Sequence, residues 1–283
     1  MTPKIQNLLT RSVTGALFVV AVICSFYYGP LTFAFFFGLV TLLSVREFCR
    51  ITQTQDSIQT NAFICSVAGL YLFLAFWAYM SGMVGGGIFI PYLLTLLYLL
   101  VSELYLKRPS PLGNWAFTML GQMYVALPFA LLNALAFQSA PHSSLGVEYR
   151  FMIPLSIFFF LWASDSGAYC FGSMFGRHKL FPRISPNKSW EGSVGGGLVA
   201  LAVSQLLATY DASLDRMGWM GLALVVVIFG TWGDLVESLI KRQLGIKDSG
   251  NILPGHGGML DRFDSSLLAI PAALIYLYTL QIL

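Results

Sequence analysis

Long apolar stretches alternate with short polar segments along the whole chain. Nine stretches can be delimited, at residues 13–29, 31–45, 61–80, 84–102, 115–136, 151–168, 193–209, 218–240 and 265–283. Most approach the roughly 20 residues that a helix needs to cross a membrane. The pattern predicts an all-α fold: a polytopic integral membrane protein of about nine transmembrane helices. The count depends most on 31–45, which is the shortest stretch and ends in charged residues.

The first stretch has two possible interpretations. Lys4 and Arg11 precede it, which is also the pattern of a cleaved signal peptide. No cleavage site between small residues follows within a few positions, and Tyr27 to Pro30 lead directly into the next apolar stretch. We therefore interpret the first stretch as an uncleaved span.

Composition narrows the class of protein. Of the 283 residues, 57% are hydrophobic and only 10% are charged, whereas about 25% are charged in an ordinary soluble protein. This excludes a disordered protein, a nucleic-acid-binding protein and a secreted disulfide scaffold. The four cysteines show no CxxC or Cys/His spacing and so predict neither a zinc site nor a disulfide framework.

Basic residues are distributed unequally between the two sides of the membrane that nine spans define. Fourteen of the 16 lysines and arginines fall on one side, and only Arg150 and Arg216 fall on the other. Cytoplasmic loops carry such an excess of positive charge. We therefore expect a cytoplasmic N-terminus and location in the inner (cytoplasmic) membrane.

Ionisable residues also divide the chain along its length. Residues 1–150 contain four acidic residues in no cluster, namely Glu47, Asp56, Glu103 and Glu148. Residues 164–192 and 230–265 hold nearly all the remaining ionisable groups, at the cytoplasmic ends of four predicted spans. We expect a transmembrane scaffold in 1–150 and a catalytic transmembrane region in 151–283, with its active site at the cytoplasmic face.

Two features precede the seventh span. Asp165 lies so close to an apolar stretch that it marks either a functional site or simply the membrane boundary. The basic loop 176–192, which includes Lys188 and Ser189, suits a polyanion, although ordinary positive-inside charge or lipid headgroups would also explain it. Within it, 185–189 has the composition of an ordered turn. Gly192 and Gly196 have the spacing of close helix packing, which we favour over phosphate binding.

A polar stripe continues the eighth span. Asp234, Glu237, Ser238 and Lys241 follow one another at helical spacing, and Arg242 comes next. Carboxylates of this kind suit Mg²⁺, which takes one or two of them together with substrate phosphates. An intrahelical ion pair between Glu237 and Lys241 is the alternative, but it leaves Asp234 unexplained.

A glycine-rich segment follows the stripe. Gly255, Gly257 and Gly258 permit turns that bring main-chain N–H groups close to a ligand. Other candidate contacts of a phosphorylated ligand are Lys247, His256 and Arg262, and Asp261 and Asp264 form a second carboxylate pair. Taken together, the residues predict Mg²⁺-dependent phosphoryl or nucleotidyl transfer at a membrane surface.

These residues also resemble a known family. The run from Ser238 to Asp264, with Lys241-Arg242, Lys247-Asp248-Ser249-Gly250 and Pro254-Gly255-His256-Gly257-Gly258, looks like the signature of phosphatidate cytidylyltransferases (CDP-diacylglycerol synthases). The resemblance is specific over 160–265 and only general over 1–150. It implies that CTP and phosphatidic acid give CDP-diacylglycerol and pyrophosphate, in phospholipid biosynthesis.

The resemblance also implies roles for single residues. The metal-site aspartates of the family map onto Asp234 and Asp261, with Asp165, Glu237 and Asp264 as supporting candidates. The expected cofactor is Mg²⁺, and a second cation in a dinuclear site is considered. The catalytic candidates are Lys188, Ser189, Ser238, Lys241, Arg242, Lys247, His256 and Arg262. Expected partners are CTP, phosphatidic acid and membrane lipid, without nucleic acid; a homodimer is considered.

Two other classes compete with this interpretation. An ion-coupled transporter also buries carboxylates, but near the middle of the bilayer on broken helices, whereas here they cluster at one face with basic residues. A polyprenol or dolichol kinase would share the constellation and differ in its nucleotide. Only the signature favours the cytidylyltransferase over the kinase.

The predicted topology can be tested at the end of the chain. Nine spans and the distribution of basic residues place the C-terminus opposite the cytoplasm. A reporter that is active only outside the cytoplasm, fused after Leu283, should therefore be active. Activity of a cytoplasmic reporter at the same position would mean that one span was miscounted, with 31–45 the first to re-examine.

Overall fold

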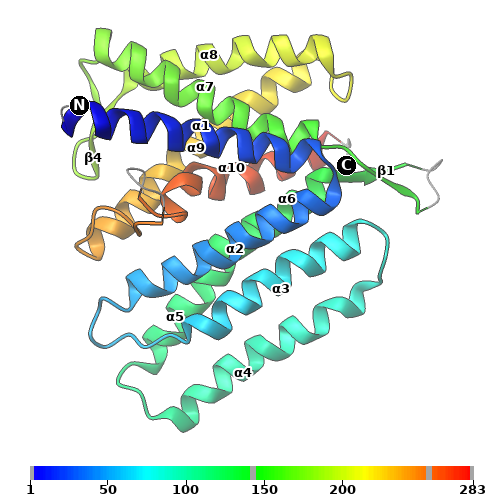
Figure 1. Cartoon of the computed structure of the whole chain (residues 1–283), viewed down its shortest axis with the longest axis vertical. Coiled ribbons are helices and arrows are strands. Elements are labelled where there is room, and N and C mark those ends of the chain that lie inside the picture. The colour runs from blue at the N-terminus through cyan, green and yellow to red at the C-terminus, as the bar shows by residue number, and fades with distance from the viewer. Residues whose placement is uncertain (1–2, 141–144, 253–256, 281–283) are drawn as a thin grey trace. The chain divides into compact units, whose positions relative to one another are not determined.

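The computed structural model describes residues 3–140, 145–252 and 257–280, and side chains from residue 12 onward. The chain divides into two compact units. Figure 1 labels helices and strands of both. The first unit comprises Met1–Tyr149 and Leu244–Phe263, and the second comprises Arg150–Gln243 and Asp264–Leu283. The polar segment 244–263 thus packs with the N-terminal part of the chain, although it follows the helices of the second unit in sequence.

The first unit is a set of helices with one short hairpin. Its elements are α1 (Pro3–Tyr27), α2 (Pro30–Thr52), α3 (Ala62–Met80), η1 (Gly86–Phe89), α4 (Ile90–Leu106), α5 (Pro111–Leu120), η2 (Gly121–Ala126), α6 (Leu127–Ala136), β1 (Phe137–Ser139) and β2 (Val147–Tyr149). The antiparallel strands pair Phe137 with Tyr149. The η2 segment is a π-helical turn between α5 and α6. Pro128 is the second residue of α6, and because proline offers no N–H to the preceding turn, the helix continues there through a widened turn.

Aromatic side chains form the core of the first unit. The Phe37 ring on α2 packs against Phe26 and Phe33, and Phe33 also packs against Phe73 on α3. Phe263, only 1% exposed, packs edge-on against Phe129 with ring centroids 5.4 Å apart. Aromatic pairs favour such tilted and edge-on arrangements. The end of the polar segment is therefore anchored in the apolar core.

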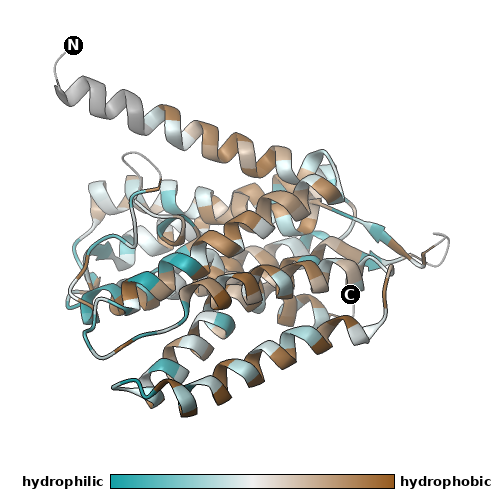
Figure 2. Ribbon diagram, turned by 60° about the horizontal axis from the view of Figure 1, so that its bottom comes forward, coloured by the Kyte–Doolittle hydropathy of each residue, from teal (hydrophilic) through white to brown (hydrophobic). Residues whose placement is uncertain are grey.

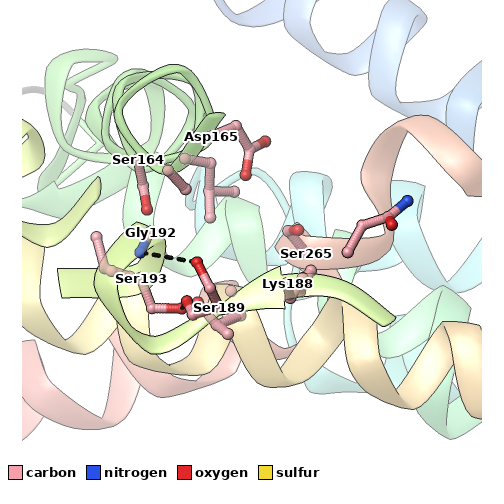
Figure 3. A pocket seen from close by; sticks show the side chains of 13 residues that line it. Ser164, Asp165, Lys188, Ser189, Gly192, Ser193 and Ser265 are labelled. Carbon is pink, nitrogen blue, oxygen red and sulfur yellow. Dashed lines mark hydrogen bonds between the residues drawn. The ribbon is translucent and has the colours of Figure 1, made fainter. Parts of the chain in front are cut away.

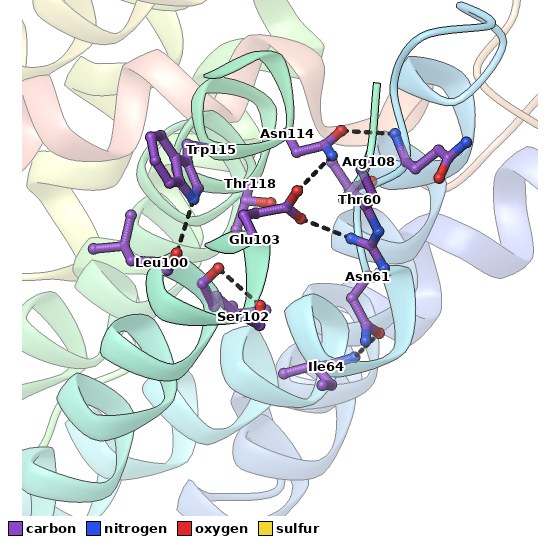
Figure 4. A network of polar contacts seen from close by, with 12 residues as sticks. Thr60, Asn61, Ile64, Leu100, Ser102, Glu103, Arg108, Asn114, Trp115 and Thr118 are labelled. Atoms are coloured by element: carbon purple, nitrogen blue, oxygen red, sulfur yellow. Dashed lines mark hydrogen bonds and ion pairs between the residues drawn. The ribbon is translucent and has the colours of Figure 1, made fainter. Parts of the chain in front are cut away.

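A buried polar network ties three parts of the first unit together (Figure 4). Glu103, near the end of α4, accepts hydrogen bonds from Arg108 Nη1 at 2.7 Å and from Asn114 Nδ2 at 2.9 Å. The Asn114 side chain in turn accepts from the backbone N–H of Gln59 at 2.7 Å. Glu103 is 6% exposed, and a buried carboxylate needs partners of this kind. The network joins α4, α5 and the segment that precedes α3.

The second unit consists of α7 (Met152–Phe175), β3 (Lys179–Phe181), β4 (Ser185–Ser189), α8 (Trp190–Tyr210), α9 (Arg216–Gln243) and most of α10 (Leu260–Thr279). Helices α7 and α8 pack closely at glycines. A Cβ at Gly196 would lie 2.5 Å from the Ser164 carbonyl oxygen, and one at Gly192 would lie 2.9 Å from that of Ala168. The prediction of close helix packing at Gly192 and Gly196 is confirmed.

The helical class is confirmed, whereas the number of spans stays a prediction. Within the described residues, each of the nine apolar stretches overlaps a helix. Six helical segments there are long and apolar enough to cross a membrane: Pro30–Thr52, Ala62–Met80, Gly86–Leu106, Pro111–Ala136, Trp190–Tyr210 and Arg216–Gln243. The stretch 31–45, the shortest in sequence, lies in the first of these. Figure 2 shows hydrophobic residues along most of the helices and hydrophilic residues near many of their ends.

Candidate active site

The sequence-predicted site residues fall into two clusters, one in each unit. The cluster of the second unit surrounds a cavity of about 70 Å³. Its walls include Ser164 and Asp165 from α7, Lys188 and Ser189 from the end of β4, and Ser265 from α10 (Figure 3). Three segments that are distant in sequence thus bring hydroxyls, a carboxylate and a cation to one small cavity.

The basic loop before α8 is ordered. Its central part forms the hairpin β3–β4, in which Lys179 pairs with Ser189. Glu191 accepts hydrogen bonds from the backbone N–H groups of Arg177 and His178, and its Oε1 lies 2.6 Å from His178 Nδ1. The expected order at 185–189 is confirmed, but as a strand instead of a turn. The hairpin fixes the backbone that carries the basic side chains, which a loose basic tether does not do.

Lys188 and Ser189 occupy the end of this hairpin, at the start of α8. Ser189 Oγ accepts a hydrogen bond from the Gly192 N–H at 3.1 Å (Figure 3) and so caps the helix. Lys188 Nζ lies 2.5 Å from Asp234 Oδ2 on α9. Both side chains of this ion pair are about one-quarter to one-third exposed, so the pair remains accessible to a ligand.

The polar stripe on α9 forms two pairs of side chains. Asp234 Oδ1 accepts a hydrogen bond from Ser238 Oγ at 3.1 Å. Glu237, only 1% exposed, forms an ion pair with Lys241. The intrahelical ion pair considered from the sequence is thus present. It accounts for Glu237 and Lys241, while Asp234 has different partners.

Asp264 lies beside this stripe in the second unit, just before the last predicted span. Its Oδ1 accepts from the Ser265 N–H at 2.6 Å. Burial and the neighbouring Asp234 carboxylate raise the pKa of Asp264 to about 7. Like charges gathered in this way favour either a proton or a bound cation.

The cluster of the first unit centres on Asp261, in the first turn of α10. Asp261 Oδ2 accepts from the Ser249 N–H at 2.8 Å, from Ser249 Oγ at 2.9 Å and from the Gly258 N–H at 2.8 Å. The Gly257 backbone has φ +78°, so the turn requires glycine there, as predicted. The N–H of Gly258, however, was expected to approach a ligand and instead binds Asp261.

Glu47 on α2 belongs to the same cluster, although the sequence placed it in the scaffold and in no cluster. Its Oε2 accepts from the Leu260 N–H at 2.8 Å and lies 3.4 Å from Ser249 Oγ. The residue is 4% exposed, and within the described part of the chain Oε1 has no hydrogen-bond partner. An acidic residue at the end of an apolar stretch is costly to bury, and this was the signal available in the sequence.

Two glycines let the loop approach Glu47. A Cβ at Gly250 would lie 2.6 Å from Glu47 Oε1, and a Cβ at Gly258 would lie 2.6 Å from Oε2. These distances exclude any side chain without a shift of the backbone or of Glu47. Part of the glycine content of the segment therefore serves the contact with Glu47.

The remaining predicted cations are at the surface. Arg242, Lys247 and Arg262 are exposed, and none of them forms an ion pair with any residue that the structure describes. They are therefore available to a polyanionic ligand. His256 lies outside the described residues, as does Gly255.

The carboxylates suit a hard cation but do not enclose one. Over 3–140, 145–252 and 257–280, no group of three or more His, Cys, Asp or Glu side chains is placed to hold a metal. Mg²⁺ is commonly bound by one or two carboxylates that are completed by water and substrate phosphates. The donor set, with hard oxygen atoms only and mutually repelling carboxylates around Asp234, fits such a site.

The long apolar helices indicate a membrane protein, and its charged and hydroxyl side chains gather in two clusters. The model of the cytidylyltransferase family matches residues 9–280. The chain is 32% identical to a phosphatidate cytidylyltransferase of Haemophilus influenzae over 280 residues, covering 92% of this chain and 95% of the relative. It is 34% identical to one of Staphylococcus haemolyticus over 249 residues, covering 86% and 88%.

The chain belongs to the cytidylyltransferase family and is a nucleotidyltransferase. The family resemblance recognised in the sequence is confirmed. A relative from Staphylococcus aureus that bears the same name is 38% identical over 194 residues, which is 60% of this chain and 74% of the relative. Membership in this family favours nucleotidyl transfer over the transporter and kinase interpretations.

The contact between Glu47 and the loop leads to a prediction about local order. Replacing Glu47 by Ala removes the acceptor of the Leu260 N–H, and an unsatisfied buried donor costs about 1–3 kcal/mol. Hydrogen–deuterium exchange measured by mass spectrometry should become faster in peptides that cover 249–252 and 257–261. Glu47→Gln retains one acceptor oxygen and should have a smaller effect.

The exposed residue Asp56 supplies a matched control. Asp56→Ala also removes one carboxylate from the segment near the end of α2 and should leave exchange in these peptides unchanged. Equal exchange in Glu47→Ala and in the unchanged protein would show that Glu47 does not hold the loop.

Proposed function

We propose that this protein transfers CMP from CTP to phosphatidic acid, which yields CDP-diacylglycerol and pyrophosphate for phospholipid biosynthesis. The main support is the family match over residues 9–280, a range that includes every residue of both clusters. Relatives at 32–38% identity carry the name phosphatidate cytidylyltransferase. We place the active site at the cytoplasmic face of the inner membrane, because the basic residues gather on that side. A homodimer stays an expectation from the sequence.

Charge repulsion is the main obstacle to this reaction. CTP and phosphatidic acid are both polyanions, and two charges about 4 Å apart interact by about 4 kcal/mol at an effective dielectric constant near 20. Lys188 lines the small cavity of the second unit, and Arg242, Lys247 and Arg262 are exposed and available. We propose that these cations bind the phosphates and bring the substrates together, which is how nucleotidyl and phosphoryl transfer is largely catalysed. Ser189, Ser238, Lys241 and His256 complete the proposed set.

We further propose that Mg²⁺ is the cofactor. Asp234 and Asp261 are the residues that we assign to the metal. Asp165, Glu237 and Asp264 are supporting candidates, whose carboxylates add negative charge. When bound, the ion would neutralise phosphate charge. In this proposal Glu237 contributes its charge without contacting the metal, because it forms an ion pair with Lys241. A second cation in a dinuclear site remains part of the hypothesis.

The substrate itself supplies the nucleophile. The phosphate of phosphatidic acid is already ionised at pH 7, so no general base has to create a nucleophile. One of its oxygens attacks the α-phosphorus of CTP, a new P–O bond forms, and the bond to pyrophosphate breaks. The acyl chains stay in the bilayer while the headgroup reacts.

Substrate selectivity tests the proposed function directly. Purified protein should convert CTP and phosphatidic acid to CDP-diacylglycerol, with at most trace turnover when ATP replaces CTP or when phosphatidylglycerol replaces phosphatidic acid. Product identity is measured by mass spectrometry of the extracted lipid. Preference for ATP, or phosphorylation of a polyprenol, would replace this proposal by the kinase interpretation.

The metal assignment predicts the effect of two conservative substitutions. Asp234→Asn and Asp261→Asn keep the shape of the side chain and lose its charge, so each should lower kcat by about 100-fold or more while the protein still inserts and purifies. Mn²⁺ binding measured by electron paramagnetic resonance should weaken in both variants, and Asp56→Asn should match the unchanged protein. Near-normal activity at low Mg²⁺ would remove the residue concerned from the metal site.

Direct transfer predicts the behaviour of an exchange reaction. Since the lipid phosphate attacks CTP without a cytidylyl-enzyme intermediate, isotope exchange between labelled pyrophosphate and CTP should vanish when lipid is removed. It should return when CDP-diacylglycerol is supplied. Sustained exchange by lipid-free enzyme would demonstrate a covalent intermediate and overturn the direct mechanism.

A further inference from the structure

A second cavity lies in the first unit and involves none of the residues assigned to catalysis. It has a volume of about 510 Å³ and lies between the last turns of α2 and the first turns of α3. Arg46 and Arg50 line it from α2, and Phe63 and Val67 line it from α3. In each helix the two residues are four positions apart, so each helix presents one continuous face to the groove.

The groove has a cationic part and an apolar part. Arg46 and Arg50 are exposed, and they make no ion pair or hydrogen bond with any residue that the structure describes. Their guanidinium groups can therefore bind a phosphate, for which arginine is well suited. Phe63 is 77% exposed and Val67 is 43% exposed, and Leu42 continues the apolar lining from α2. An apolar wall beside unpaired cations is matched by a molecule with a phosphate and a hydrocarbon chain.

The edges of the groove are fixed by local contacts. Gln53 donates from Nε2 to the Thr60 carbonyl oxygen at 2.5 Å, which closes the connection between α2 and α3. Asn61 accepts from the Ile64 N–H at 3.1 Å and caps α3. The two helix faces are thus held together at the end of the groove, so binding there needs no rearrangement of the connection.

We propose that this groove binds an anionic glycerophospholipid of the membrane, with the headgroup phosphate at Arg46 and Arg50 and an acyl chain along Phe63 and Val67. Basic pockets between membrane helices on the cytoplasmic side bind anionic lipids in this way. The ligand is a lipid and not a free phosphate or nucleotide, because half of the lining residues are apolar and two of these, Phe63 and Val67, are exposed. The site is independent of the proposed reaction and would exist even if the catalytic assignment failed.

Native mass spectrometry of the purified protein in detergent tests the proposal. The diagnostic probe is dioleoyl-phosphatidylglycerol, since phosphatidic acid would also bind as a substrate; dioleoyl-phosphatidylcholine supplies a zwitterionic comparison. Arg46→Gln/Arg50→Gln should weaken phosphatidylglycerol binding by about 30-fold, on the basis of the usual contribution of two arginines near a membrane surface. Each single substitution should weaken it by about fivefold. Binding of phosphatidylcholine should not change.

A matched variant, Lys107→Gln/Arg216→Gln, removes two positive charges elsewhere and should bind phosphatidylglycerol as the unchanged protein does. Glycerol 3-phosphate has the phosphate but no acyl chains. It should bind at least tenfold more weakly than the lipid, because it buries no hydrocarbon against Phe63 and Val67. Equal phosphatidylglycerol binding by Arg46→Gln/Arg50→Gln and the unchanged protein would overturn the proposal, whatever phosphatidic acid does. Glycerol 3-phosphate binding as tightly as the lipid would overturn the role of the apolar wall.

Discussion

Backbone N–H groups bound by buried carboxylates hold the polar segment 244–263 in place. Asp261 takes the N–H groups of Ser249 and Gly258, and Glu47 takes that of Leu260. Hydrogen bonds to an ionised acceptor are stronger than neutral ones, and more so where water is excluded. Among the described residues of the segment, the buried apolar side chains are Leu260 and Phe263, both at its end. Its conformation, and with it the position of every cation it carries, therefore depends on these two acids.

The cost of an unpaired charge also explains the ion pairs of the second unit. Lys188 is neutralised by Asp234, and Glu237 by Lys241, because an unpaired charge near apolar helices is costly. The two pairs differ in exposure. The buried pair of Glu237 and Lys241 is a fixed part of the helix, whereas Lys188 and Asp234 are partly exposed and can exchange partners. This exposure leaves Lys188 accessible to an anion and Asp234 accessible to a cation, while each neutralises the other without a ligand.

Hydropathy alone predicted where the helices lie, because helices that are long and apolar enough to cross a membrane are apolar over most of their length. It placed their ends poorly: the stretch 31–45 belongs to a helix that runs from Pro30 to Thr52, with polar residues in its last turns. The contact of Gly192 and Gly196 with α7 was predictable from spacing. The partners of Glu47 were not, since Ser249 is 202 positions away and no local pattern encodes such a pairing. The hairpin β3–β4 was not predicted because β3 has only three residues and β4 is polar and contains a proline.

Helix α2 shows how one element can meet two opposite electrostatic demands. Successive residues on a helix differ by about 100° in direction, so Arg46 and Glu47 point to different sides although they are neighbours in sequence. Glu47 enters the protein, where backbone N–H groups replace water as its partners, while Arg46 and Arg50 stay at the surface beside apolar side chains of α3. Exchanging the two charges would fail on both sides, because an arginine has no acceptor to meet the Leu260 N–H and a carboxylate cannot bind a phosphate. The order of acid and base along α2 is therefore set by what each face contacts, and the excess of positive charge near its end is only part of the explanation.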